Sequence, residues 1–155
     1  LLYTKNVIAG NTPGFLSGDI IPKFNSGGVS TYLADAWLNH VLKNTAYTVP
    51  TNLYVALSLA NPGDTGSGLS QPSGNGYSRI LHNTWKTAAN GATSNNGIIT
   101  FIEATGTWGQ ITHAALYDHL TAGNMLLYST LSPAQTPTIG DTVRYLDGQF
   151  IININ

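Results

Sequence analysis

The hydrophobic and polar positions divide the chain into an irregular leading segment, one helix and a series of short strands. Apolar side chains are frequent in residues 1–30, but Pro13, Pro22 and several glycines interrupt both the helical and the strand period. This segment cannot form a core alone, and it is too apolar for a solvated tail. We therefore expect an extended N-terminal arm that lies on another protein, the alternative being that it covers its own sheet. Its expected partner-binding residues are Leu2, Tyr3, Val7, Ile8, Phe15, Leu16, Ile20, Ile21 and Phe24.

The next segment has the pattern of an amphipathic helix. Ser30 or Thr31 can cap its start, and apolar residues recur four apart between Leu33 and Leu42. Asn44 and the residues after it predict an end near residue 45. The apolar stripe is wide enough to be buried, so we expect the helix to pack at an edge of the domain.

From Thr51 the apolar period changes to two residues, which is the period of a half-buried strand. Residues 61–75 are rich in Gly, Ser and Pro and have the composition of a surface loop. Asp147 and Gly148 form a hairpin signal between the last two strand-like runs. The expected strands are residues 53–59, 76–82, 97–102, 110–117, 125–131, 142–145 and 149–154.

Several short strands with turn residues between them indicate a mainly β fold. We predict an antiparallel β-sandwich or barrel with one N-terminal amphipathic helix and an extended N-terminal arm. The arm is residues 1–30, and the helix and sandwich form a single domain over residues 31–155.

Composition narrows the classes of function. The chain has 155 residues, of which only 8% are charged, and a surface built mostly of small polar residues is typical of a protein packed among neighbours. A net charge of −1 indicates no excess of positive charge for binding the phosphates of nucleic acid. No apolar run approaches the roughly 20 residues of a membrane span. The absence of cysteine excludes disulfides, thiol catalysis and thiolate metal sites.

Candidate catalytic and metal-binding residues are few. His113, Asp118 and His119 form the one local cluster, but their predicted positions do not converge as zinc ligands do, and His113 is expected to be a hydrogen-bonded strand residue. The carboxylates Glu103, Asp118, Asp141 and Asp147 fall near predicted turns, where the local backbone explains the aspartates. We therefore predict no enzyme and no cofactor.

Aromatic residues leave carbohydrate binding open, because an exposed ring can stack on a sugar. Tyr77, Trp85, Trp108 and Tyr128 are available for this role. Trp108 is expected instead to fill the core at the end of the sandwich, since a tryptophan beside a strand start usually adds its area to the interior.

The region from Tyr32 to Ile154 resembles a widespread domain of tailed-bacteriophage virion proteins, often labelled phage tail fibre protein. The resemblance rests on motifs in a fixed order, namely YLADAWLNHVLKNTAYTVP, TNLYVALSLANPGDTGSG, SGNGYSRI, ATSNNGIITFIEATGTWGQITHAALYD, GNMLLYSTL and GDTVRYLDGQFIININ. It implies a small β-sandwich with a leading helix, built into a virion, and it brings no catalytic residues. Similar proteins usually begin close to the helix, so residues 1–31 are a departure from the pattern.

The arm and the resemblance together predict a structural virion protein. The favoured role is a capsid cement or decoration protein on the head surface, which stabilises the shell by clamping neighbouring subunits. Its expected partners are the major capsid protein and copies of itself, with a trimer as the expected assembly. The alternative is a tail fibre or tail-tip module that binds host-surface carbohydrate. Neither nucleic acid nor a membrane is an expected partner.

Overall fold

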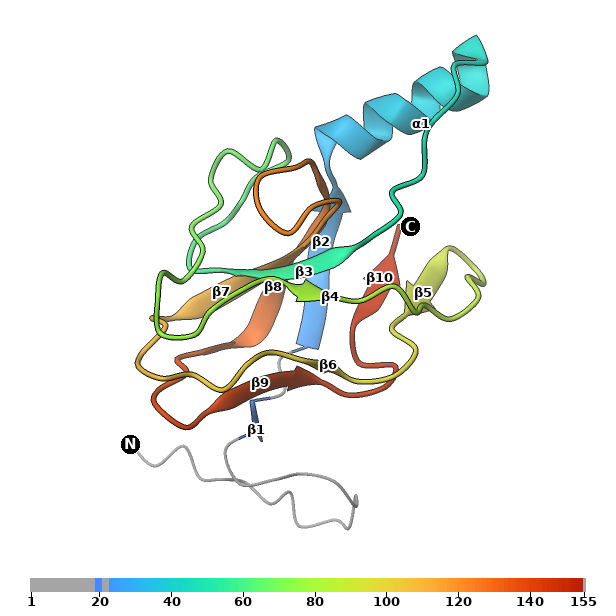
Figure 1. Cartoon of the computed structure of the whole chain (residues 1–155). Coiled ribbons are helices and arrows are strands. Elements are labelled where there is room, and N and C mark those ends of the chain that lie inside the picture. Colours follow the sequence, from blue (N-terminus) through green and yellow to red (C-terminus); the bar gives the residue numbers. More distant parts are fainter. Residues whose placement is uncertain (1–18, 21–22, 155) are drawn as a thin grey trace.

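The computed structural model describes residues 19–20 and 23–154 of the chain, and the side chains from residue 28 onward (Figure 1). One helix and a set of mostly short strands make up this part of the chain, as the sequence predicts. In chain order the elements are β1 (Asp19–Ile20), β2 (Lys23–Val29), α1 (Thr31–Lys43), β3 (Tyr54–Ser58), β4 (Ile80–Leu81), β5 (Ala92–Ser94), β6 (Ile99–Thr100), β7 (Ile111–Tyr117), β8 (Met125–Gln135), β9 (Thr142–Tyr145) and β10 (Ile151–Asn153).

The strands form two facing layers. One layer is an antiparallel five-stranded sheet with the order β2-β8-β7-β3-β4. The other layer contains β1-β9-β6, in which only β1 runs parallel to its neighbour, and the antiparallel pair β10-β5. The predicted mainly β, sandwich-like fold is confirmed, and the layers do not close into a barrel.

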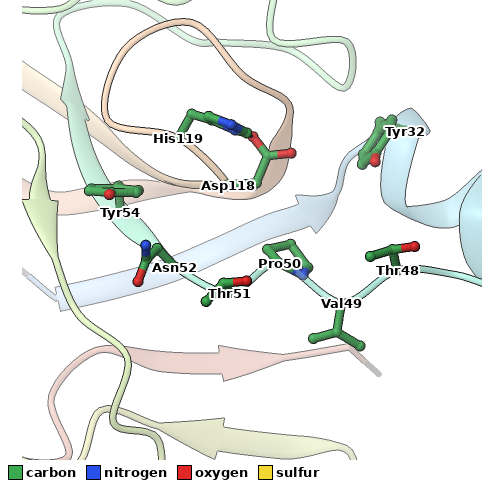
Figure 2. Close-up of a pocket in the computed structure, with 9 residues that line it drawn as sticks. All are labelled: Tyr32, Thr48, Val49, Pro50, Thr51, Asn52, Tyr54, Asp118 and His119. Atoms are coloured by element: carbon green, nitrogen blue, oxygen red, sulfur yellow. The ribbon is translucent and has the colours of Figure 1, made fainter.

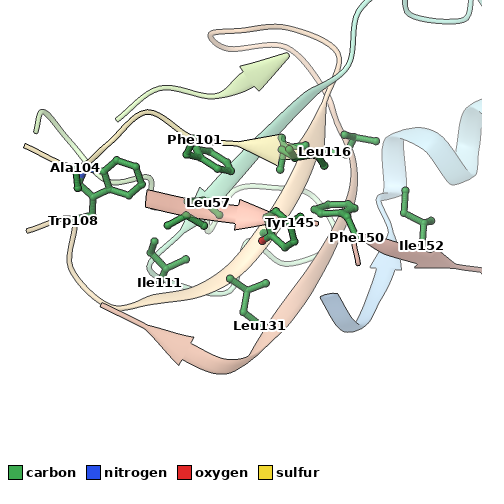
Figure 3. Packing of buried hydrophobic residues seen from close by; sticks show 14 residues of the cluster. Leu57, Phe101, Ala104, Trp108, Ile111, Leu116, Leu131, Tyr145, Phe150 and Ile152 are labelled. Carbon is green, nitrogen blue, oxygen red and sulfur yellow. The ribbon is translucent and has the colours of Figure 1, made fainter. Parts of the chain in front are cut away.

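A large apolar core lies between the layers (Figure 3). Tyr145 and Phe150 meet edge to face with ring centroids 4.9 Å apart, a favourable geometry for aromatic pairs. Trp108 is only 3% exposed, and its Nε1 donates to the Asn75 carbonyl at 2.8 Å, which confirms its predicted place in the core. Other buried members include Leu57, Ile99, Phe101, Ile111, Leu116, Leu131 and Val143.

Strand β3 differs from its prediction because both of its faces are buried. Ala56 and Ser58, on the face away from the main core, have no exposed surface. The loop of residues 61–75 covers this face: Leu69 packs on the cluster that contains Ala56, and the Ser70 N–H donates to Ser58 Oγ at 3.0 Å. The alternation in the sequence identified the strand but did not show that a loop buries its second face.

The turn at Asp147 and Gly148 is not a hairpin, since β9 and β10 belong to different sheets. Gly148 has a φ of 77°, as a tight turn requires. The turn is held by another segment: Asp147 accepts from the Gly97 N–H at 2.9 Å, and the wholly buried Asn95 donates to the Leu146 carbonyl at 2.8 Å. These bonds fix the turn through which the chain passes from β9 to β10, which pairs with β5.

The end of the predicted arm pairs with the domain itself. The backbone of β2 runs antiparallel to β8, with Phe24 opposite Leu131 and Gly28 opposite Tyr128. β1 runs parallel to β9, with Ile20 opposite Val143. Pairing satisfies backbone groups that an isolated arm would leave to solvent. The sheet therefore begins at residue 23, ahead of the predicted domain boundary at residue 31.

Helix α1 confirms the predicted helix but not its predicted burial. Ser30 caps it, since Ser30 Oγ accepts from the Leu33 N–H at 3.1 Å. Leu33 is the only helical residue that is buried. Leu38 is 57% exposed, and Val41 and Leu42 are each 75% exposed. The helix projects beyond the sheets instead of packing along an edge (Figure 1).

Candidate functional site

A cleft lies where the start of α1, the chain leading into β3 and the β7–β8 turn meet (Figure 2). Its volume is about 330 Å³, which falls within the range of about 300–1,000 Å³ that is typical of small-molecule sites. We call it the tyrosine cleft, and its lining residues are Tyr32, Thr48, Val49, Pro50, Thr51, Asn52, Tyr54, Asp118 and His119.

The two tyrosines are placed by anchored backbone. Tyr32 lies in the first turn of α1, where the Ser30 N–H donates to the Leu126 carbonyl and the Thr31 N–H to the Asp64 carbonyl, each at 2.9 Å. Tyr54 begins β3 and is paired with Leu81 and Tyr117 on its two sides. The two walls that carry these tyrosines are therefore fixed to the five-stranded sheet.

The third wall is the turn of residues 118–124. Asp118 accepts from the Asn124 backbone N–H at 2.6 Å and from Asn124 Nδ2 at 2.8 Å, and its Oδ1 lies 3.0 Å from His119 Nδ1. Gly123 has a φ of 73°, and an added Cβ there would lie 2.4 Å from Asp118 Oδ1. Glycine is therefore required for the carboxylate to take this position.

Arg79 holds the same turn from inside. It is 6% exposed, and its Nη1 donates to the carbonyls of His119 and Ala122, each at 2.8 Å. Its guanidinium lies 3.8 Å from the centroid of the Tyr117 ring, a cation–π contact. Sequence reasoning missed this residue. The one available signal was a basic residue within a strand-like run of a chain that has only six.

The described residues that line the cleft include one aspartate and no lysine or arginine. Burial acts to raise the pKa of the Asp118 carboxyl, but hydrogen bonds from His119 and Asn124 outweigh it and lower that pKa. Asp118 is therefore ionised at neutral pH and can only accept hydrogen bonds. The electrostatics favour a neutral or cationic ligand over an acidic one.

Acid–base hydrolysis of a glycoside needs a second carboxylate about 5–9.5 Å from the first, and Asp118 is the only carboxylate among the described lining residues. The aspartates instead confirm the predicted turn chemistry. Asp141 accepts from the Thr138 N–H at 2.8 Å, as Asp147 does from Gly97. Within the described part of the chain, no three His, Asp or Glu side chains are grouped as a metal site.

His113 is the hydrogen-bonded strand histidine that the sequence predicts. Its Nδ1 lies 2.8 Å from Thr112 Oγ1, and burial lowers its pKa. Across residues 19–20 and 23–154, no helix is long and apolar enough to cross a membrane.

The aromatic residues considered for sugar stacking are mostly engaged elsewhere. Tyr77 packs edge to face on the buried Trp108 with centroids 5.3 Å apart, and burial raises its pKa to about 12. Trp85 packs against Phe150, and the Tyr128 hydroxyl donates to Asp64. The tyrosines of the cleft were not identified from the sequence, because three segments distant along the chain form it.

None of the predicted partner-binding residues is among the described residues that line this cleft. Ile20 and Phe24 lie in β1 and β2, where only their backbone pairing is described. The remaining members lie outside the described residues, and their role stays a prediction: Leu2, Tyr3, Val7, Ile8, Phe15, Leu16 and Ile21.

The described part of the chain is a small β-sandwich with a projecting helix and a cleft in which the described lining residues include one carboxylate. The comparison with protein families identifies its family. The family described as Podophage GP4 fiber I protein gp80 matches residues 28–153, which is most of the chain. The chain belongs to this family and is a structural virion protein of a tailed bacteriophage, so the resemblance seen in the sequence is confirmed. No curated protein sequence matches it.

Proposed function

We propose that this chain is a module of a phage fibre and that it binds neutral or amino sugars of the host surface in the tyrosine cleft. The family description supports a fibre over a capsid decoration protein. The observation that carries sugar binding is the combination, in one cleft, of two tyrosines with amide, hydroxyl and carboxylate groups.

This combination matches the two kinds of surface on a sugar ring. The apolar C–H face packs on an aromatic ring, and Tyr32 is 44% exposed and available for such a contact. Sugar hydroxyls donate to an ionised carboxylate and exchange hydrogen bonds with amides and hydroxyls, which Asp118, Asn52 and Thr51 provide. The turn that carries Asp118 is already fixed, so binding costs little conformational entropy there.

The proposed role is binding without hydrolysis. Both oxygens of Asp118 already accept hydrogen bonds from Asn124, and the described lining residues include no second carboxylate to act as acid or nucleophile. Acidic sugars are disfavoured because the Asp118 carboxylate has the same sign.

A glycan array of neutral, amino and acidic bacterial surface saccharides, probed with the full chain, tests this proposal. We expect binding to neutral or amino sugars, with affinity at least about tenfold weaker for Tyr32→Ala, a loss of about 1.4 kcal/mol. Ile139→Ala is the matched control, since Ile139 is also exposed but does not line the cleft. Equal binding by the Tyr32 variant, or binding confined to acidic sugars, would reject the site.

A second candidate is capsid decoration, supported by the apolar composition of residues 1–18. In this role the segment would clamp the major capsid protein of neighbouring subunits. Deleting residues 1–18 is the appropriate test, because it spares β1 and β2, which pair with the sandwich. If decoration is the function, the full chain co-sediments with phage shells and the deletion variant does not. Failure of the full chain to co-sediment would reject decoration and leave the fibre proposal standing.

A further inference from the structure

We propose that the tyrosine cleft selects sugars that carry an N-acetylated amino group, such as N-acetylglucosamine. The observation behind this inference is a hydrogen-bond donor and a hydrogen-bond acceptor on different walls of the cleft, namely Asn52 Nδ2 and Asp118 Oδ2. An acetamido group carries the matching acceptor and donor. The inference rests on the proposed function, because it names which of the neutral and amino sugars the cleft prefers.

Neighbouring hydrogen bonds fix the orientation of the Asn52 amide. The Leu53 N–H donates to Asn83 Oδ1 at 2.8 Å. Because this oxygen faces the backbone, the other end of the Asn83 amide is a donor, and its Nδ2 donates to Asn52 Oδ1 at 2.9 Å. Turning the Asn52 amide over would set its two N–H groups against those of Asn83. Asn52 Nδ2 is therefore the free end, and among the described residues it has no hydrogen-bond partner.

The free end of this amide faces the cleft. In Figure 2 the nitrogen of Asn52 lies on the side of Tyr54, and its oxygen lies on the opposite side. Asn52 is exposed, so a ligand can reach its Nδ2. An amide nitrogen only donates, so the ligand atom at this wall must be an acceptor, such as a carbonyl oxygen.

The opposite requirement holds at Asp118. Its Oδ1 accepts from the Asn124 N–H and lies 3.0 Å from His119 Nδ1, so both acceptor positions of this oxygen are used. Its Oδ2 accepts from Asn124 Nδ2 at 2.8 Å and keeps one further acceptor position. Figure 2 shows this second oxygen pointing away from His119, toward the side of the cleft that holds Tyr32. The side chain is 9% exposed, which fits a single additional hydrogen bond from an N–H or O–H group of the ligand.

A trans amide meets both requirements with one group. Its N–H and its C=O point to opposite sides of a planar unit, so it can bridge a donor and an acceptor on different walls. A hydroxyl also donates and accepts, but through a single oxygen atom, so it bridges only partners that lie close together. The ammonium group of a free amino sugar can donate to Asp118 but offers Asn52 Nδ2 no acceptor. The acetamido group is therefore the better match.

The remaining parts of such a sugar also find matching surface. Val49 and Pro50 add apolar side chains to the lining, together with the rings of Tyr32 and Tyr54. The acetamido methyl group and the C–H face of the sugar ring can pack on these surfaces. Each part of an N-acetylated sugar thus has a counterpart among the described lining residues.

Calorimetric titration of the full chain with N-acetylglucosamine, glucose and glucosamine at neutral pH tests the inference, because these sugars differ only in the group on one ring carbon. We expect N-acetylglucosamine to bind at least about tenfold more tightly than glucose, which corresponds to about 1.4 kcal/mol, and more tightly than glucosamine. N-acetylgalactosamine and galactose repeat the comparison on the epimeric ring. Equal affinities within both pairs would overturn the preference and leave sugar binding standing. Binding of neither pair would also overturn it, and the glycan array then decides whether the proposed function fails as well.

Asn52→Asp gives a second measurement, which a loss of folding would not mimic. The variant keeps the oxygen that accepts from Asn83 but replaces the donor Nδ2 with an acceptor. The preference for N-acetylglucosamine should disappear, and glucosamine should become the tightest ligand, because its ammonium group can donate to both carboxylates. Asn61→Asp is the matched control: Asn61 Oδ1 also accepts, from the Gly63 N–H at 2.9 Å, but Asn61 does not line the cleft, so the natural order should persist. An unchanged order in the Asn52 variant would contradict the inference.

Discussion

The sandwich and the projecting helix have the same kind of amphipathic pattern but opposite burial. In the sandwich, the alternation that runs into β10 places Phe150, just before the strand, and Ile152 in the core, where they are 0% and 8% exposed. In α1, the stripe is equally regular, yet Leu38 and Leu42 are more than half exposed. The pattern therefore specifies the element and its apolar face, but not the surface that covers it.

The two regions differ in what anchors them. Each strand of the sandwich is held by neighbours along its length, and loops such as residues 61–75 close the remaining face. The helix is held at one end, by the Ser30 cap and by Leu33. An apolar face in the first region contributes to the stability of the monomer, whereas in the second it is available to a partner.

The largest effect should come from the core. Phe150→Ala removes a fully buried ring between Tyr145 and Trp85 and should lower the free energy of unfolding by about 3–5 kcal/mol. Urea unfolding measures this loss. A loss below about 1 kcal/mol would mean that packing around Phe150 contributes little to the free energy of unfolding.

A smaller loss is expected at the buried guanidinium. Arg79→Met leaves the carbonyls of His119 and Ala122 without their donor and should cost about 1.5–3 kcal/mol. Hydrogen exchange should accelerate in residues 118–124. The control is Lys86→Met, because Lys86 pairs with Asp147 at the surface and such pairs contribute about 0–1 kcal/mol. Equal losses in the two variants would contradict the anchoring role of Arg79.

The Asp118 carboxylate should make the free energy of unfolding depend on pH. The pKa of Asp118 is lowered in the folded state, so its contribution is complete above the unfolded pKa of about 3.9 and is lost as pH falls through the folded pKa. Asp118→Asn should cost about 1 kcal/mol at pH 7. The difference from the natural chain should shrink toward pH 2, as urea unfolding can determine. A constant difference would refute the ionised role of Asp118.

The smallest effect should come from the exposed apolar face of α1, which includes Leu38, Val41 and Leu42. Leu42→Ser should change the unfolding free energy of the monomer by no more than about 0.5 kcal/mol, because the side chain is 75% exposed. Asn39→Ser, on the polar face, is the matched control. If Leu42→Ser instead cost about 2 kcal/mol, the stripe would pack on its own sandwich, and the contrast between the two regions would be lost.

The tyrosine cleft was only partly predictable. The sequence placed Asp118 and His119 in a turn, and the structure confirms that position. It gave no indication that Tyr32 and Tyr54 lie beside that turn, because the three segments meet only when the sheet forms. Arg79 was hidden for the same reason, since its two carbonyl partners are about forty residues away along the chain.

The sequence by itself determined the elements that depend on local spacing: the cap at Ser30, the helix that follows it, most of the strands and the inward place of Trp108. Residues a few positions apart fix these features through backbone geometry and alternation. Tertiary structure decided which faces are covered. It gave β3 two buried faces, brought the end of the expected arm into the sheet as β2 and left the stripe of α1 open. Burial depends on which distant segments meet, and no local period specifies that.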